Sequence, residues 1–485
     1  MAILGRAVAS AALWAVLAAP PPVASAAERP NILWLVAEDL GPHLGSDGAR
    51  EVKTPRLDRL AAEGARYTRF FTTAPVCSAS RSAFMTGMYQ TTIGAHNHRS
   101  HRDDGYTLPP GVRVLTDWMR DAGYFAANVV RFPEGVELAG TGKTDWNFTY
   151  RGRPSDSDRW EDLKAHEPFF AQVNFSETHR ASVEKQGTPW PYPRRADPER
   201  VVLPPYYPDH PVTRRDWAGY LDAVTSLDEK VGKVLDLLER DGLASRTVVV
   251  FFGDNGQAHV RGKQFCYDSG LHVPMIVRLP RALAAGKGPA AGTVVEALVS
   301  AIDLAPTMLS IAGAKPPERM QGQVFLGAHA APVRRYVFGA RDRCDETVFR
   351  FRTVRDARYR YIRNFTPERP LLQPNRYKEA SYPVWNLIKE LHRDGRLTAV
   401  QARLAAPTMP DEELYDTEAD PHETENLASS SLPAHQEALR RLRGVLEEWI
   451  ETTDDKGRAP EPPEVAAAKG STRPGSDPNA SAVRP

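Results

Sequence analysis

The stretch that decides the fold is Pro30-Asn31-Ile32-Leu33-Trp34-Leu35-Val36-Ala37-Glu38-Asp39-Leu40-Gly41, an apolar run that ends in two acids and a glycine. Its apolar part has the length and continuity of a strand that is buried on both faces. In open parallel sheets, the residues that follow the carboxyl end of a strand face a crevice. We therefore expect Glu38 and Asp39 to line a site.

A second run repeats this plan more than two hundred residues later. It reads Thr247-Val248-Val249-Val250-Phe251-Phe252-Gly253-Asp254-Asn255, a β-branched and aromatic strand that ends in an acid and an amide. If the two strands share a sheet edge, Glu38, Asp39, Asp254 and Asn255 bring four oxygen donors together. Such donors suit a hard divalent ion, and their loose geometry favours calcium over magnesium. The alternative is that each pair only caps the helix that follows it.

The chain between and around these runs alternates between helix and strand patterns. Residues 54–64 carry a cap, a first-turn proline and a terminal glycine, and apolar residues recur at helical spacing from Trp217 to Leu238. We predict an α/β fold with a large, mostly parallel sheet sandwiched by helices. The expected helices cover residues 54–64, 112–122 and 217–238, and further strands cover residues 124–130 and 167–175.

A smaller carboxyl-terminal α+β subdomain is expected after a region rich in proline and glycine. Two neighbouring strand patterns, residues 348–353 and 359–364, belong to it. The predicted organisation is a signal peptide over residues 1–26, a catalytic α/β domain over residues 27–334, the subdomain over residues 335–452 and a disordered tail over residues 453–485. The tail is rich in proline, alanine, serine and charge, and has too few apolar residues to order itself.

Composition fits an exported globular protein. The chain has 485 residues, is 41% hydrophobic and has a formal net charge of +1, so no global field favours nucleic acid or an anionic membrane. Residues 1–26 have a basic start at Arg6, an apolar stretch and a small-residue end, which is typical of a cleaved signal peptide. We expect a periplasmic or secreted protein without a membrane span.

Cysteines are scarce, which excludes a scaffold built on disulfides. The chain has three, Cys77, Cys266 and Cys344. The last two either pair or remain two buried free thiols.

The run Cys77-Ser78-Ala79-Ser80-Arg81, continued to Thr86-Gly87, resembles the maturation signal of type I, formylglycine-dependent sulfatases of the alkaline phosphatase superfamily. Ala79 stands where the commoner form of that signal has proline. The resemblance spans residues 29–450 and includes residues 413–428, which match the family's carboxyl-terminal segment. It implies that a formylglycine-generating enzyme oxidises Cys77 to an aldehyde, and that calcium is bound by the four oxygen donors together with residue 77.

The resemblance also implies roles for ionic side chains of the crevice. Arg81 holds the modified side chain, Lys143 and Lys263 match the sulfate-binding lysines, His179 matches a strand-end histidine that serves as general acid, and Asp254 accepts a proton. Two residues depart from the usual pattern. Asp145 stands where many relatives have a histidine, and Glu38 stands where most have aspartate.

The chemistry that follows is displacement at sulfur. One hydroxyl of the hydrated aldehyde attacks the sulfate ester, the lysines and the cation stabilise the developing charge, and His179 assists the leaving oxygen. The second hydroxyl then expels sulfate, an exit that a serine nucleophile lacks.

Specificity is expected in two polar, basic loops, residues 94–102 and 339–345. Their candidate substrate contacts are His98, Arg99, Arg341 and Arg343, and the alternative is that these side chains only order the loops. The pattern is closest to sulfamidase-like and polysaccharide sulfatases, so we predict hydrolysis of O-sulfate or N-sulfate on a sulfated glycan. A phosphodiesterase or phosphonate monoester hydrolase of the same superfamily, and a noncatalytic glycan-binding relative with unmodified Cys77, remain the alternatives.

Overall fold

The computed structural model describes residues 29–98, 105–180, 190–281, 283, 288–327 and 329–461. The predicted signal peptide, the candidate residue Arg99 and the predicted tail beyond Glu461 lie outside the described residues.

An eight-stranded sheet forms the centre of the molecule, in the order β5-β4-β6-β1-β7-β8-β2-β9. β1 (Asn31–Ala37) lies between β6 (Phe169–Phe175) and β7 (Thr247–Gly253) and is parallel to both. Every residue of these three strands is buried, which explains their unbroken apolar runs. The other strands are β4 (Phe125–Arg131), β5 (Ser157–Arg159), β8 (Met275–Arg278), β2 (Ala65–Tyr67) and β9 (Thr293–Val295), and the antiparallel pairs are those that β8 makes with β7 and β2.

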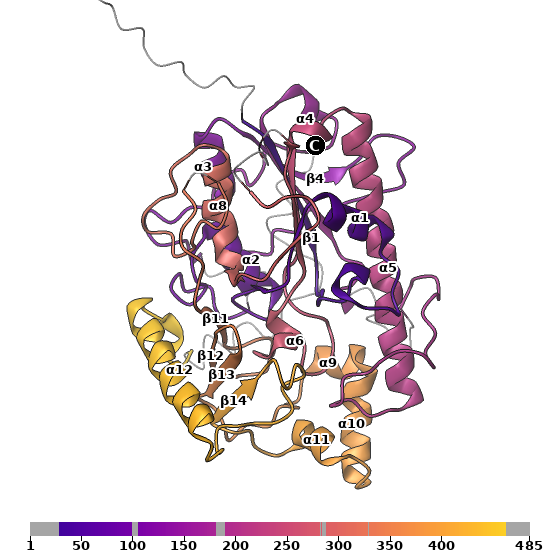
Figure 1. Cartoon of the computed structure of the whole chain (residues 1–485), viewed down its shortest axis with the longest axis vertical. Coiled ribbons are helices and arrows are strands. Elements are labelled where there is room, and N and C mark those ends of the chain that lie inside the picture. Colours follow the sequence, from indigo (N-terminus) through magenta and orange to yellow (C-terminus); the bar gives the residue numbers. More distant parts are fainter. Residues whose placement is uncertain are drawn as a thin grey trace, which may run out of the picture.

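Helices cover both faces of this sheet (Figure 1), as predicted for an α/β fold. Alternate β1 side chains point to opposite faces. Leu33 and Leu35 join a core that contains residues of α1 (Pro55–Glu63) and α5 (Pro211–Arg240). Trp34 and Val36 join a second core with residues of α2 (Cys77–Thr86), α3 (Leu115–Asp121) and α8 (Leu304–Ile311). The sheet is therefore sandwiched between two helical layers.

A second sheet follows in the carboxyl-terminal part. Its four antiparallel strands are β11 (Val337–Arg341), β12 (Phe351–Arg355), β13 (Tyr359–Asn364) and β14 (Glu412–Asp416). The helix α12 (Pro433–Thr452) packs against it (Figure 1) through Leu439, Leu442 and Leu446. The remaining elements include β3 (Phe70–Phe71), β10 (Val299–Ser300), α4 (Asp162–Ala165), α6 (Asp268–Leu271), α9 (Arg376–Ser381), α10 (Pro383–Arg393) and α11 (Ala399–Ala402).

The predicted elements are all present, with shifted ends. The helix predicted over residues 217–238 is α5, which begins at Pro211 and has 30 residues. The strand predicted over residues 348–353 begins only at Phe351, because a tight turn with mutual backbone hydrogen bonds between Cys344 and Thr347 precedes it. No helix in the described part of the chain is both long enough and apolar enough to cross a bilayer.

The predicted disordered tail starts too early. Residues 453–461 are ordered, because two of their carboxylates pair with buried arginines. Asp455 is 2% exposed and pairs with Arg352, and Glu461 accepts a hydrogen bond of 2.6 Å from Arg343. The composition of residues 453–485, taken as a whole, does not indicate these two contacts.

Candidate active site

The predicted oxygen donors meet where β1 and β7 end. The backbone N–H of Asp254 donates to the carbonyl of Ala37 over 2.9 Å, and the backbone N–H of Asp39 donates to Asp254 Oδ1 over 3.0 Å. Asp39 has a φ of 51°, a left-handed conformation that a non-glycine residue rarely adopts. The two loops are thus bonded to each other, and backbone strain accumulates at this point.

Asn255 presents an amide oxygen to the same place. Its Nδ2 donates to Asp39 Oδ1 over 2.9 Å, whereas its buried Oδ1 accepts no hydrogen bond from any described residue. A buried acceptor without a donor is costly unless a cation or water meets it. Together with Glu38, Asp39 and Asp254, all at most 2% exposed, it forms a set of carboxylate and amide oxygens that fits calcium.

Each acid of the pocket also has its own cation. Lys143 Nζ lies 2.7 Å from Glu38 Oε2, Lys263 Nζ lies 2.9 Å from Asp39 Oδ2, and Arg81 Nε lies 2.9 Å from Asp254 Oδ2. The three ion pairs balance the charge of the buried acids. A divalent cation added to this set would leave surplus positive charge, which suits an anionic substrate.

The pKa values of the three acids differ for physical reasons. Burial raises the pKa of Asp39, but Lys263 and His179 outweigh it and lower that pKa to about 2. Lys143 and His179 likewise outweigh burial at Glu38, so its pKa is lowered. At Asp254 the effect of burial on the pKa exceeds the opposing effect of Arg81, so the pKa of Asp254 is raised. Asp254 is therefore the acid best suited to accept a proton.

Cys77 is the first residue of α2, and its Sγ lies 3.6 Å from Asp39 Oδ1. It is 3% exposed, and burial raises the pKa of its thiol well above the usual value. Because the thiolate is the reactive form of cysteine, an unmodified Cys77 is a poor nucleophile at neutral pH.

Arg81 lies one helical turn after Cys77, as the sequence predicts. Its Nη1 donates to Asn174 Oδ1 over 2.7 Å, and its buried Nη2 donates to no described residue. Asn174 Nδ2 in turn donates to Asn128 Oδ1 over 3.0 Å. No role was predicted from the sequence for Asn174 or Asn128. Asn174 is a polar residue near the carboxyl end of the apolar strand β6, a signal that could have identified it, whereas Asn128 lies in the middle of β4.

His179 follows β6, and its Nε2 lies 3.7 Å from Asp39 Oδ2. Burial and the charge of Lys263 lower the pKa of His179 to about 4. The neighbouring Arg180 anchors this loop, because it pairs with Asp216 of α5 and donates to the carbonyls of Ala258 and Ser381. The contact between Arg180 and Asp216 was not predicted from the sequence either.

Lys143 approaches from the loop after β4. Its Nζ lies 3.4 Å from Asp145 Oδ2, and Asp145 has a φ of 51°. The acid that stands in place of the expected histidine is thus a partner of the lysine.

The candidate substrate contacts differ in their position relative to Cys77. His98 Nδ1 lies 2.7 Å from the hydroxyl of Ser78, next to Cys77. Arg341 is 2% exposed and donates to Gln264 and Thr347. Arg343 donates to Glu461 and to the carbonyls of Asp345 and His98. Both arginines thus order loops, and their contact with substrate stays a prediction.

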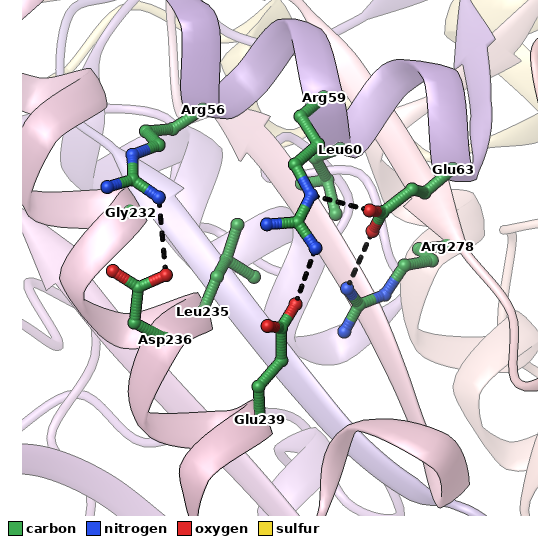
Figure 2. A pocket seen from close by; sticks show the side chains of 9 residues that line it. All are labelled: Arg56, Arg59, Leu60, Glu63, Gly232, Leu235, Asp236, Glu239 and Arg278. Carbon is green, nitrogen blue, oxygen red and sulfur yellow. Dashed lines mark hydrogen bonds and ion pairs between the residues drawn. The ribbon is translucent and has the colours of Figure 1, made fainter.

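Other features do not add to the site. The three cysteines are free and buried, so Cys266 and Cys344 do not pair. Figure 2 shows a groove between α1 and α5 that is crossed by ion pairs of Arg56 with Asp236 and of Arg59 with Glu239. It contains none of the predicted site residues.

Comparison with known proteins identifies the family and several relatives. A family model described as Sulfatase matches residues 30–314. An ulvan-active sulfatase of Formosa agariphila is 35% identical over 478 residues, which cover 90% of this chain and 77% of that protein. The N-sulphoglucosamine sulphohydrolase of Homo sapiens is 27% identical over 479 residues, which cover 88% of this chain and 90% of that protein.

A solved structure shares the fold. A 2-O GAG sulfatase aligns with a TM-score of 0.63 at 20% identity, covering 90% of this chain and 96% of the other.

Proposed function

This chain belongs to the sulfatase family, and we propose that it is an exported hydrolase that removes sulfate from a sulfated glycan. The observation that carries the proposal is the position of Cys77 at the start of α2, beside Asp39 and within a pocket of three buried acids and three cations. Formylglycine at position 77, made by a formylglycine-generating enzyme, and calcium complete the proposed site.

The two groups that the site would hold have separate tasks. Glu38, Asp39, Asp254 and Asn255, with residue 77, would hold calcium. The hydrate of a formylglycine at position 77 would supply a nucleophilic hydroxyl, and bound calcium would supply positive charge for the sulfate oxygens.

Side chains of this chain bind the sulfate and transfer the protons. Lys143 and Lys263 bind the anionic sulfate, and their ammonium groups stay protonated because the pKa of each is raised well above its usual value by the acid it contacts, despite burial. Asp254, with its raised pKa, takes the proton of the attacking hydroxyl. His179 donates to the leaving oxygen once the negative charge of the substrate favours its protonated form. The first turn of α2 directs backbone N–H groups towards the same anion.

The substrate class is inferred from the residues beside the pocket and from the relatives. His98 lies next to the catalytic motif, and the loop from Arg341 to Asp345 is polar and basic. The relatives named above act on ulvan and on N-sulphoglucosamine. We therefore infer a sulfated saccharide, with either O-sulfate or N-sulfate as the bond cleaved. Export is inferred from the pattern of residues 1–26.

The deciding experiment is mass spectrometry of the peptide that contains position 77, on protein co-expressed with a formylglycine-generating enzyme. We expect the mass change for replacement of the thiol by an aldehyde, and release of sulfate from a sulfated oligosaccharide. The variant Cys77→Ala should keep the far-UV circular dichroism and release no sulfate. An intact thiol in fully active protein would overturn the proposal. Faster turnover of phosphate diesters or phosphonate monoesters would favour the related hydrolase, and an inert, unmodified protein that binds glycan would favour the noncatalytic alternative.

A further inference from the structure

A second cluster of metal-ligating side chains lies outside the four oxygen donors and Cys77. It consists of His98, Cys344 and Asp345, whose ligand atoms all lie within 4.8 Å of one another. Cys344 Sγ lies 3.7 Å from Asp345 Oδ2, and His98 Nε2 lies 4.0 Å from Asp345 Oδ1. The three residues come from two loops that are more than 240 positions apart in the sequence, so only the fold brings them together.

Each of the three is held by a second layer of contacts. His98 Nδ1 lies 2.7 Å from Ser78 Oγ, and the tautomer that donates to this hydroxyl leaves the Nε2 lone pair facing Asp345. Metal-binding histidines typically have such a partner on the other ring nitrogen. Cys344 is fixed by two backbone hydrogen bonds with Thr347, each 3.0 Å long.

Arg343 links the two loops. It donates to the carbonyl of Asp345 over 2.8 Å and to the carbonyl of His98 over 3.2 Å, and it pairs with Glu461 over 2.6 Å. Asp345 has a φ of 51°. Arg343 thus holds Asp345 in a left-handed conformation, which aspartate adopts more readily than most residues.

The donor set and its dimensions fit a transition metal of the zinc class. Imidazole nitrogen, thiolate sulfur and carboxylate oxygen are zinc ligands, and tetrahedral bonds of the usual lengths place neighbouring ligand atoms roughly 3.3–3.6 Å apart. The two observed separations, which end on different oxygens of Asp345, are 3.7 and 4.0 Å, and all the ligand atoms lie within 4.8 Å of one another, so the side chains must move closer together to bind the ion. The side chains of His98 and Asp345 are 26% and 32% exposed, so they have room to close that gap.

Charge is compatible with a divalent ion. The cations near Cys344 are Arg341, Arg343, Lys263 and Lys378, of which Arg343 is paired with Glu461 and Lys263 with Asp39. On binding, the Cys344 thiol loses its proton to solvent, and the thiolate and the Asp345 carboxylate together neutralise the ion.

We propose that His98, Cys344 and Asp345 form a second metal site, distinct from the calcium site, that binds Zn²⁺ or a similar transition metal. Three protein ligands leave a fourth position for water or for an anionic oxygen of a bound saccharide. The site would then lie at the edge of the substrate crevice, because His98 contacts Ser78, the residue that follows Cys77 in α2.

The test uses the full chain with Cys77→Ala, which cannot be matured and lacks the thiol of the catalytic pocket, in buffer saturated with calcium. Titration with Co²⁺ should produce the near-ultraviolet charge-transfer absorption of a thiolate–cobalt bond at one equivalent, and Zn²⁺ should displace it. Adding Cys344→Ser should abolish the absorption. Adding Cys266→Ser, which changes the other buried thiol, should leave it intact.

A second measurement tests the supporting contacts. In the same background, Ser78→Ala or Glu461→Gln should weaken Zn²⁺ binding by about 10- to 100-fold in calorimetric titration, as is usual for the partners of metal ligands. The proposal is overturned if no thiolate–cobalt absorption appears, or if it survives in Cys344→Ser. Because these readouts need no turnover, they are independent of whether the sulfatase proposal holds.

Discussion

The pocket pairs each acid with a different cation, and this arrangement shows what single residues contribute. Lys143 lies against Glu38 and Lys263 against Asp39, while both lysines are also the candidate sulfate ligands. In the proposed mechanism, each lysine would turn from its acid to the sulfate when bound calcium neutralises the acid. The pocket is thus suited to bind cation and anion together.

Asn255 gives a direct test of the calcium site. Asn255→Ala removes the buried Oδ1 that accepts no hydrogen bond in the described structure, and we expect calcium affinity to fall by about 10- to 100-fold, a loss comparable to that for the partners of metal ligands. Calorimetric titration with calcium measures it. The matched control is Asn31→Ala, a buried asparagine at the other end of β1, which should lower stability and leave calcium affinity unchanged. Equal affinity in the two variants would exclude Asn255 as a ligand.

His179 gives a test of proton transfer. His179→Ala should slow esters of poor leaving groups, such as sugar sulfates, by about 100- to 10,000-fold, and should affect activated aryl sulfates far less, because these leave without a proton. The ratio of kcat/KM for the two substrate classes measures the effect. Equal losses on both would reject the acid role, and Lys263, whose ammonium lies in the same pocket, would become the better candidate.

At the scale of elements, helices place and stabilise the site residues. α2 begins at Cys77, so the partial positive charge of its N-terminus lies where an anion is expected. α5 helps in another way. Asp228, in the middle of α5, accepts hydrogen bonds from the backbone N–H groups of Arg56 and Leu57 and so caps α1. The side chain of Thr54, the N-cap residue of α1, makes no capping bond.

The cap on α1 is measurable. Asp228→Ala should lower the free energy of unfolding by about 1–2 kcal/mol, the usual effect of losing a helix cap, as followed by urea denaturation. Asp236→Ala is the matched control, since Asp236 lies on the same helix and pairs with the side chain of the same Arg56 in the exposed groove of Figure 2. Its loss should cost less than about 1 kcal/mol. A larger effect from Asp236 would contradict this assignment.

At the scale of the whole molecule, the carboxyl-terminal part supports the loop that carries Lys263. Arg261, two residues earlier, donates to the carbonyls of His422 and Glu423. The side chain of Glu423 accepts from the backbone N–H of Asp268 over 2.7 Å and lies 2.8 Å from Arg360. One segment therefore joins the two sheets next to the catalytic loop.

The buried Glu423 in this segment predicts that the stability of the fold depends on pH. Burial and the neighbouring Asp268 raise the pKa of Glu423 to about 7 from its ordinary 4.5. The folded state then binds a proton that the unfolded state has lost, so this contribution to stability is full below pH 4.5, falls as the pH rises and is gone above pH 7. Glu423→Gln should flatten the stability profile over this range, measured as Tm against pH. A profile that is unchanged in the variant would contradict the assignment to Glu423.

The sequence alone determined much of the architecture and of the catalytic pocket. The apolar runs 31–37 and 247–253 became adjacent parallel strands, because a strand buried on both faces needs an unbroken apolar sequence. Acids and an amide at the ends of two such strands must meet at one edge of the sheet. The sulfatase family followed from the motif around Cys77 and the α/β fold from the alternation of strand and helix patterns, and the comparisons confirmed both.

Tertiary structure alone decided the rest. The pairing of Arg343 with Glu461, the anchor between Arg180 and Asp216, the cap that Asp228 provides and the cluster of His98, Cys344 and Asp345 join residues that share no local pattern. Nothing in the spacing of such residues records their contact. The physical reason is that periodicity and strand ends specify which backbone edge a residue occupies, whereas the partner of a buried charge is set by how separate loops pack over that edge.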